Sequence, residues 1–364
     1  MKYIVPEYFK HFKCKSGSCR HSCCEGWPVR ISMKEYYKLI GINCSKKLRT
    51  KLDCALKICS KPSAVCYAEI ANKWNGICML NQVDGLCYLQ RELGESVLPE
   101  ICRIYPRKLV QLSESNLCSC SNSCEAVVEL LYAQKTPMQF EEMDIAIHPK
   151  FEVKLTMQQL EECKKAISIL QDRTQSLPER LFTLGNFLNG YEYYTPNMSD
   201  LSLAFQFLYS LDKYYENSMS VSDYCRSAEN YFCIDRKDTL TSEDQLMISE
   251  KYAYAIKQLD IHLPEWQDVF EQLLVNHIFY SIFPYTESLA SRNDAYLSLV
   301  IIYSFLRINL LGFIANETNK DRLIDFFAAM FRLIDHSSFD YITVEFLKGM
   351  KYSVGNLITQ LLHV

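Results

Sequence analysis

The chain has 364 residues, a hydrophobic content of 49% and a net charge of -4, a composition typical of a folded globular protein with one or two domains. The slight acidic excess argues against nucleic-acid binding, because phosphate backbones are bound by a surplus of Lys and Arg on one face. The first residues, Met1–Glu7, lack the apolar core of a signal peptide, so a cytoplasmic location is expected.

Cysteine is the unusual residue of this sequence, with seventeen copies, of which fourteen lie between Cys14 and Cys124. In a cytoplasmic chain disulfides are disfavoured, so clustered cysteines are more often metal ligands. Thiolates are soft ligands that suit iron–sulfur clusters or zinc. The candidate metal ligands are Cys14, Cys19, Cys23, Cys24, Cys78, Cys87, Cys102 and Cys124.

The spacing of these cysteines predicts a site that ties several segments together, since a single zinc finger needs only four ligands at short paired spacing. Four cysteines between the first two groups are interpreted as small buried hydrophobic residues or surface thiols, namely Cys44, Cys54, Cys59 and Cys66. Cys118 and Cys120 lie next to Cys124, and they leave the register of that ligand open. His21 lies inside the first group and is an alternative ligand. The sequence does not decide between one cluster with spare cysteines and two separate sites.

We expect two domains, a cysteine-rich metal-binding module at 1–134 and a helical domain at 135–364. The module is loop-rich, with a short helix over Met33–Leu39 and six of the eleven glycines before residue 100. Apolar residues at helical spacing then predict an all-α bundle. The expected helices are Leu155–Leu170, Glu179–Leu188, Asp200–Tyr215, Ser242–Leu259, Glu265–Phe283, Ala295–Ala315, Asp321–Asp335 and Ile342–Leu362.

Two of these helices carry start signals. Ser242 with Gln245 resembles a capping box, and Pro264 suits a first turn. The segment Tyr296–Ala315 is apolar enough to span a membrane, but Arg307 sits in its middle, at a cost of about 2.5–3.5 kcal/mol at the centre of a bilayer. We interpret it as a buried core helix and expect no membrane association.

Several motifs are absent or incomplete. No G-x-G-x-x-G loop appears, so a cofactor-binding site of the Rossmann type is not expected. The Cys19-x3-Cys23 pair matches only the first half of a radical S-adenosylmethionine loop, because Gly26 stands where its third cysteine would be. His277 and His336 lie on apolar helix faces and are interpreted as hydrogen-bonded core histidines rather than as ligands.

A family resemblance rests on a series of motifs that runs from about residue 5 to residue 340. They are Cys19-x3-Cys23-Cys24-x-Gly26-Trp27, Gly76-x-Cys78, Gly85-x-Cys87-x2-Gln90, Cys102-x2-Tyr105-Pro106-Arg107, Val275-Asn276-His277, Phe283-Pro284 and Phe331-Arg332-Leu333-Ile334-Asp335-His336. Together they resemble the flagellin lysine-N-methylase family. The family's Ser-Cys-Pro-Glu-Ala run corresponds here to Ser123-Cys124-Glu125-Ala126, without the proline.

The resemblance implies an S-adenosylmethionine-dependent methyltransferase that acts on surface lysines of flagellin and holds a [4Fe-4S] cluster, with zinc as the alternative metal. The residues around Cys102, which are Arg103, Tyr105 and Arg107, are candidates for binding the donor, although the two arginines would equally suit structural salt bridges. No spacing singles out a catalytic residue. The alternatives are a non-enzymatic iron- or zinc-binding protein with a helical protein-interaction domain and a redox sensor.

Overall fold

The computed structural model describes residues 1–27, 29–112, 115–148, 151–189, 202–211, 214, 219–233, 241–286, 288–350 and 354–364. The chain divides into two compact units: unit 1 comprises Met1–Phe12 and Leu109–Val364, and unit 2 comprises Lys13–Lys108. This division differs from the boundary expected at residue 134. The reason is that the first strand pairs with strands that follow residue 115, so both ends of the expected module join the helical part.

Unit 2 is built on a small antiparallel sheet in the order β2 (Val29–Ile31), β4 (Ala68–Ile70), β3 (Leu56–Ile58). Its helices are α1 (Met33–Gly41), α2 (Lys46–Ala55), α3 (Tyr88–Leu93) and α4 (Glu100–Ile104), with short 3-10 turns at Ser16–Ser18 and Glu95–Val97. The expected helix at Met33–Leu39 is confirmed. It begins with a capping box in which the side chains of Ser32 and Glu35 accept each other's backbone N–H groups.

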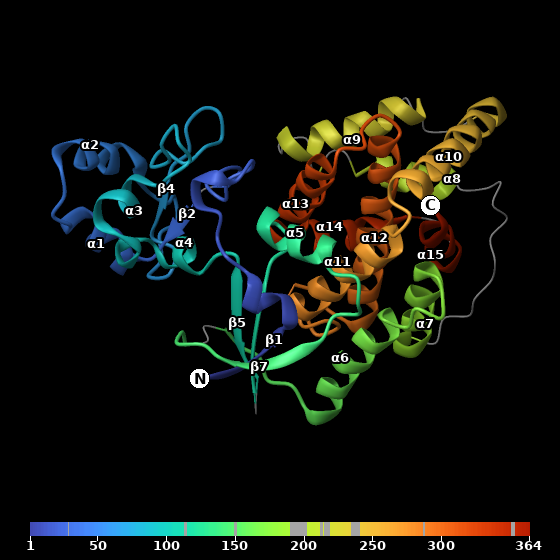
Figure 1. Cartoon of the computed structure of the whole chain (residues 1–364), viewed down its shortest axis with the longest axis horizontal. Helices are drawn as coiled ribbons and strands as arrows, with labels where there is room; N and C mark the ends of the chain where they lie inside the picture. The colour runs from blue at the N-terminus through green and yellow to red at the C-terminus, as the bar shows by residue number, and fades with distance from the viewer. Residues whose placement is uncertain are drawn as a thin grey trace. The chain divides into compact units, whose positions relative to one another are not determined.

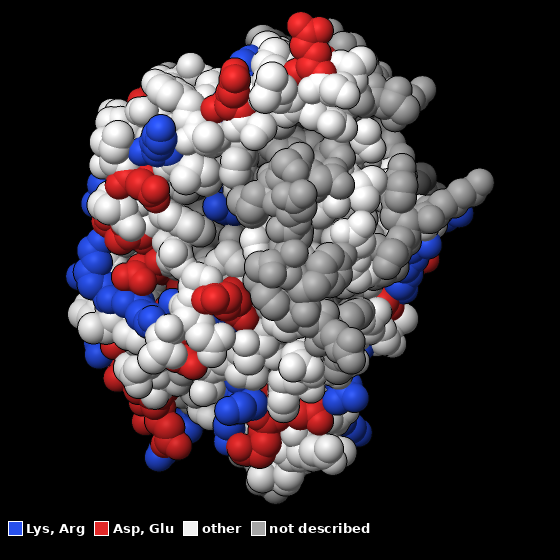
Figure 2. Space-filling view, turned by 90° about the vertical axis from the view of Figure 1, so that its right-hand side faces the viewer, with Lys and Arg blue, Asp and Glu red and all other residues white. Residues whose placement is uncertain are grey.

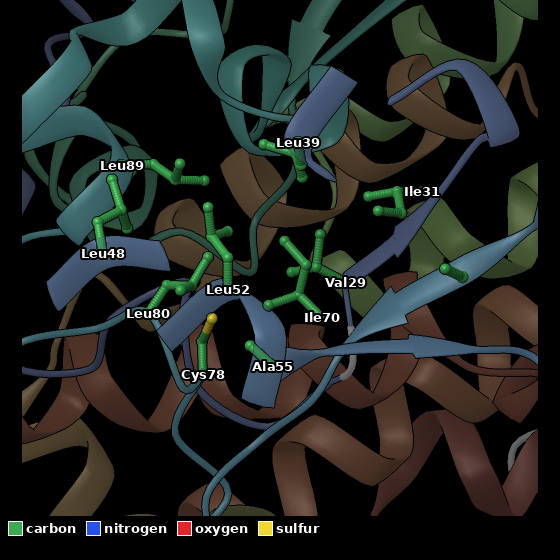
Figure 3. Close-up of a cluster of buried hydrophobic side chains, with 11 residues drawn as sticks. Val29, Ile31, Leu39, Leu48, Leu52, Ala55, Ile70, Cys78, Leu80 and Leu89 are labelled. Atoms are coloured by element: carbon green, nitrogen blue, oxygen red, sulfur yellow. The ribbon is translucent and has the colours of Figure 1, made fainter. Parts of the chain in front are cut away.

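The core of unit 2 consists of aliphatic side chains from the sheet and from α1–α3. Figure 3 shows Leu52 of α2 between Ile70 of β4 and the pair Leu48 and Leu89, with Cys78 close by. All of these side chains are buried, and the partly buried Cys24 and Cys87 pack against the same cluster. Part of the candidate thiol set therefore borders an apolar core.

Unit 1 contains a five-stranded sheet, which the helical pattern did not predict. Its order is β7 (Phe140–Asp144), β1 (Lys2–Pro6), β6 (Asn116–Cys120), β5 (Arg107–Gln111), β8 (Phe151–Glu152). Strand β1 runs antiparallel to β7 and parallel to β6. The expectation of an all-α bundle after residue 134 is thus wrong for β7 and β8, while the mainly helical character of the chain is confirmed.

The helices of unit 1 surround α12 (Arg292–Ile314), which packs against α7, α9, α10, α13, α14 and α15 (Figure 1). The others are α5 (Glu125–Ala133), α6 (Met157–Leu170), α7 (Leu177–Asn189), α8 (Ser202–Tyr209), α9 (Met219–Phe232), α10 (Ser242–His262), α11 (Trp266–Ser281), α13 (Lys320–His336), α14 (Phe339–Gly349) and α15 (Val354–His363). A 3-10 turn, Glu7–His11, follows β1.

The expected helices of unit 1 match these elements, with three differences. The expected helix Ile342–Leu362 is two helices, α14 and α15, and neither α5 nor α9 was predicted. The capping box of α10 uses Thr241 and Asp244, one residue earlier than expected. Parts of the expected helix Asp200–Tyr215, including residues 200–201 and 212–213, lie outside the described residues.

Helix α12 is long and apolar enough to cross a membrane by length and composition alone, but every residue of its most apolar stretch is buried inside the protein. The Arg307 guanidinium lies 5.0 Å from the centre of the Trp266 ring and donates a hydrogen bond to the Val364 carbonyl oxygen. The buried cation therefore has an aromatic ring and a carbonyl acceptor within the fold. This agrees with the interpretation of a buried core helix.

The surface charge is mixed. Figure 2 shows one face on which acidic and basic side chains alternate, without a large patch of one sign among the described residues. This distribution is in keeping with the net charge of -4.

Candidate functional site: a thiol cluster and a buried polar network

The loops of unit 2 that carry Cys24, Cys78 and Cys87 are joined by backbone hydrogen bonds. The N–H of Cys78 donates to the Cys24 carbonyl at 2.7 Å, and the N–H of Asn81 donates to the Cys78 carbonyl at 3.0 Å. A β-bridge then pairs Asn81 with Cys87. These contacts bring three cysteines that are far apart in the sequence onto adjacent strand-like segments.

Two glycines allow a fourth loop to approach. A Cβ at Gly17 would lie 2.5 Å from the Asp84 carbonyl oxygen, and a Cβ at Gly85 would lie 2.9 Å from the Gly17 carbonyl oxygen. Gly85 also has a φ of +77°, a conformation that costs any other L-residue energy. The segment between Cys14 and Cys19 is therefore in backbone contact with the segment that precedes Cys87.

Four thiols in unit 2 interact electrostatically in every pairwise combination, and we call them the four-thiol set: Cys24, Cys78, Cys87 and Cys102. Desolvation, and then the charges of the other thiols, raise the pKa of Cys78 to about 11. The same causes raise the pKa values of Cys87 and Cys102. Thiols this close together cannot all ionise without a cation between them.

Cys23 lies beside the four-thiol set. Its thiol donates to Cys24, which raises the pKa of Cys23 and lowers that of Cys24, and it also interacts with Cys102 and Cys14. The hydroxyl of Ser22 and the side chain of Asn81 are further hydrogen-bond partners of the Cys24 thiol. Cys24 is thus the thiol of this pair whose charged form is favoured.

The four-thiol set offers soft sulfur donors, which suit an iron–sulfur cluster or zinc. Among the described residues, no three His, Cys, Asp or Glu side chains come close enough together to hold one metal ion. A [4Fe-4S] cube binds each cysteine through a different iron, so its thiolates stand farther apart than those around one zinc ion. The four-thiol set supplies four cysteines from four segments, which is the number that such a cube binds. Three of them, Cys24, Cys78 and Cys87, border the apolar core of unit 2.

The other predicted ligands are placed differently. Cys14 and Cys19 belong to unit 2, close in sequence to Gly17, and Cys14 interacts with Cys23. Cys124 belongs to unit 1, where it forms the N-cap position of α5. The roles of all eight cysteines as ligands stay predictions, but the structure groups Cys124 with unit 1 rather than with the four-thiol set.

The candidate donor-binding residues lie at the end of α4. Arg103 is half exposed and lies 3.9 Å from the Glu100 carboxylate, which is the structural salt bridge considered for it. The Tyr105 ring packs against Trp27, with 5.4 Å between ring centres, so it joins α4 to the loop of Cys24. Arg107 begins β5 and is partly buried. Their role towards a methyl donor stays a prediction.

A second group of chemically versatile side chains lies in unit 1, where the loop after β6 meets α11 and α13. The carboxylate of Asp335 is 2% exposed and accepts a hydrogen bond from His277 Nδ1 at 3.1 Å. Its other oxygen accepts from Ser121 Oγ at 2.5 Å. Ser121 Oγ lies 2.6 Å from Ser123 Oγ, which in turn lies 2.8 Å from His336 Nε2. We call these five residues the Asp335 network.

The number of protons that these side chains can donate sets the direction of each hydrogen bond in this chain. The hydroxyl proton of Ser121 goes to Asp335, so Ser121 Oγ accepts the proton of Ser123, and Ser123 Oγ accepts from His336 Nε2. In the neutral form of His336 the basic lone pair is therefore on Nδ1.

The ionisation states follow from the surroundings. Burial alone would raise the pKa of Asp335, but the hydrogen bond and charge of His277, together with His336 and Ser121, outweigh it and lower that pKa. Desolvation lowers the pKa of His336, partly opposed by Asp335 and reinforced by Arg332. At neutral pH the Asp335 network thus holds an ionised carboxylate and a neutral His336.

Buried amides fix the loop that carries Ser121 and Ser123. Asn276 on α11 donates to the Cys120 carbonyl at 2.8 Å and to the Asn122 side chain at 2.6 Å, and Tyr8 donates to Asn276 at 2.7 Å. The Asn122 side chain donates to the Leu273 carbonyl at 2.8 Å. The two serines are therefore held by a rigid, fully bonded support.

His277 and His336 are both hydrogen-bonded, as expected, but His277 is only partly buried and His336 is exposed, so the interpretation as core histidines is wrong for His336. Their common network was not predicted. Three of the motifs that carry the family resemblance contribute to it, through Ser123, His277 and Asp335–His336. The sequence thus contained residues of the Asp335 network in three short polar motifs. Nothing in their spacing showed that they meet.

Comparisons with known proteins bear on the family resemblance. Residues 193–357 match the family model described as the FliB lysine N-methylase C-terminal domain. Over a match of 110 residues, the chain is 24% identical to a lysine-N-methylase of Salmonella choleraesuis. The match covers 28% of this chain and 25% of that protein. These matches confirm the resemblance to the flagellin lysine-N-methylase family.

Two further relatives are similar over the same share of this chain. One is the flagellar biosynthetic protein FliU of Salmonella muenchen, 23% identical over 28% of this chain and 60% of its own length. The other is a lysine-N-methylase of Salmonella typhimurium, 23% identical over 25% of its own length. The match thus spans about a quarter of the two lysine-N-methylases. No solved structure matches this chain.

Proposed function

We propose that this protein transfers methyl groups from S-adenosylmethionine to lysine side chains of flagellin in the cytoplasm. The observation that carries the proposal is the match of residues 193–357 to the FliB lysine N-methylase C-terminal domain. The names of the relatives, lysine-N-methylase and flagellar biosynthetic protein, support both the reaction and the substrate. The non-enzymatic alternative is not favoured, because these names denote an enzyme.

The proposal includes a [4Fe-4S] cluster in unit 2, held by Cys24, Cys78, Cys87 and Cys102. Mutual interaction of all four thiols supports this choice among the eight candidates. When bound, the cluster would supply four metal–thiolate bonds that join the segments of the unit. Ser22 and Asn81 then hydrogen-bond the Cys24 sulfur, which sets its orientation and electron density. Zinc is the alternative metal, but it would require these thiols to move closer together, because no three of them form a single-ion site among the described residues.

Methyl transfer needs a neutral lysine amine, because the ammonium form has no lone pair with which to attack the donor. We propose Nδ1 of His336 as the acceptor of that proton. His336 is exposed and neutral at pH 7, and its Nε2–H is held by Ser123, which orients the ring. The hydrogen-bond chain to Asp335 stabilises the positive charge that His336 acquires.

The test is incubation of anaerobically purified protein with flagellin and isotopically labelled S-adenosylmethionine, followed by mass spectrometry of flagellin lysines. We expect labelled methyl groups on surface lysines and an iron–sulfur absorption band in the visible range. The methylase proposal would be refuted if flagellin carries no labelled methyl group after incubation with protein that retains its full metal content. A colourless protein with stoichiometric zinc would refute the cluster but leave the methylase intact.

Matched variants separate the parts of the proposal. Cys78→Ser should lower iron content and methylation together, whereas Cys54→Ser, an exposed cysteine of the same unit, should leave both unchanged. His336→Gln should retain iron and lose methylation by about 10²–10⁴-fold, the usual contribution of a general base. An unchanged rate in His336→Gln would exclude its role as proton acceptor.

A further inference from the structure

Cys233 and Lys251 form a close pair in unit 1, apart from the four-thiol set and the Asp335 network. Cys233 follows the last residue of α9 in a left-handed conformation with a φ of 53°. Lys251 lies on α10, which packs against α9. The Nζ atom of Lys251 lies 2.7 Å from the Sγ atom of Cys233. Neither residue has a part in the proposed methyl transfer.

The distance is short for a non-bonded contact. N–H···O hydrogen bonds span about 2.7–3.2 Å, and sulfur is a larger acceptor than oxygen, so a hydrogen bond to a thiol is longer. A direct bond to sulfur is shorter, about 2.0 Å even between two sulfur atoms. A separation of this size between Nζ and Sγ is expected when the nitrogen and the sulfur are both bonded to the same oxygen atom.

Other contacts hold the lysine at this place. Its Nζ also donates to the Tyr231 carbonyl oxygen at 2.7 Å, and Tyr231 Oη donates back to the Lys251 carbonyl at 3.1 Å. The ammonium group lies 5.8 Å from the centre of the Tyr231 ring. The thiol of Cys233 donates to the Asn230 carbonyl at 3.5 Å, and the residue is exposed. The two reactive groups are thus pre-positioned and accessible to a small oxidant.

We propose that Lys251 and Cys233 form a reversible covalent N–O–S bridge, with dioxygen as the oxidant. The amine loses one hydrogen and the thiol loses its hydrogen, and one oxygen atom becomes bonded to both Nζ and Sγ. The second oxygen atom leaves as water with the two hydrogens. Nitrogen and sulfur together lose four electrons, which reduce both oxygen atoms. Two equivalents of dithiothreitol reverse the reaction, returning amine and thiol and releasing the bridging oxygen as water.

The bridge would tie the end of α9 to the third turn of α10, inside the stretch that matches the family model. A cross-link that closes this loop restricts the unfolded chain and so stabilises the helical part. Formation of the bridge would therefore change the stability of unit 1, whereas the four-thiol set lies in unit 2.

The test compares full-length protein prepared with and without oxygen, digested under non-reducing conditions and analysed by mass spectrometry. We expect, in the aerobic sample, a linked peptide pair containing Cys233 and Lys251 with one oxygen atom gained and two hydrogen atoms lost. The pair should be absent from the anaerobic sample, from dithiothreitol-treated protein and from Cys233→Ser and Lys251→Arg. Cys225→Ser, a buried cysteine of the same helix, is the matched control and should retain the pair.

Two results would overturn the proposal. The first is recovery of separate peptides with free Cys233 and unmodified Lys251 from aerobic protein. The second is a linked pair that has lost two hydrogens without gaining oxygen, which would indicate a direct N–S bond. As a second readout, dithiothreitol should lower the melting temperature of aerobic wild-type protein more than that of aerobic Cys233→Ser. Reduction of all other cysteines affects both proteins, so the difference between them reports the loss of the bridge.

Discussion

Asp335→Ala is the most direct test of the Asp335 network. The side chain is 2% exposed, and its removal would leave His277 Nδ1–H and the Ser121 hydroxyl without their acceptor. Each unsatisfied buried polar group costs about 1–3 kcal/mol, and the substitution leaves two such groups. We therefore expect the free energy of unfolding of unit 1 to fall by about 2–6 kcal/mol.

Urea unfolding followed by the fluorescence of Trp266 measures this change. Trp266 is buried in unit 1, and substitution of Trp27 and Trp74 by Phe removes the two tryptophans of unit 2. Asp144→Ala is the control, since its side chain is 81% exposed and the change should be within about 0.5 kcal/mol. A loss in Asp335→Ala of under about 1 kcal/mol would refute the assigned buried hydrogen bonds.

Acid dependence provides an independent check through Asp335→Asn. Because the pKa of Asp335 is lowered in the folded protein, its ionised form contributes stability above the unfolded value near 3.8, and this contribution is lost as the pH falls through the lower folded value. The stability difference between wild type and Asp335→Asn should thus be largest near neutral pH and shrink below about pH 4. A difference that stays constant to low pH would show that the Asp335 charge is not linked to folding.

Two further substitutions test packing. Glu271→Gln leaves Arg180, whose guanidinium lies 2.6 Å from the buried Glu271 carboxylate, without its counter-charge, and chemical denaturation should show a loss of about 3–5 kcal/mol. Gly85→Ala combines a positive φ with a 2.9 Å approach to the Gly17 carbonyl, so it should lower the melting temperature of unit 2 and its iron content. Gly94→Ala, with a similar φ and open space around it, should cost only the conformational strain of about 1–2 kcal/mol; equal effects would argue against the loop contact.

The helices of unit 1 were predictable because their signal is local. In α6 and α13, apolar residues recur at the helical period within a few turns, and that pattern alone predicts one buried face. The strands were not predictable in the same way. Strand β1 finds its partners β6 and β7 more than 100 residues later, so no pattern within Lys2–Pro6 indicates the pairing.

The candidate sites were likewise predictable only where the indication was local in the sequence. Cysteine content and grouping, read with the soft-ligand chemistry of thiolates, indicated a metal site and eight candidate ligands. Which of them lie together depends on the backbone pairing of Cys24 with Cys78 and on the close approach of Gly17 and Gly85. The same holds for Asp335, whose partners come from α11 and from the loop after β6.

By itself, the sequence determined the residue types, the helical periodicity and the motifs of a lysine-N-methylase relative, because these depend on neighbours along the chain. The tertiary structure alone decided that 13–108 forms a unit of its own, that four thiols of that unit interact, and that His336, Ser123 and Asp335 share one hydrogen-bond chain. Such juxtapositions depend on contacts between residues distant in the chain, which only the packing of the folded protein brings together.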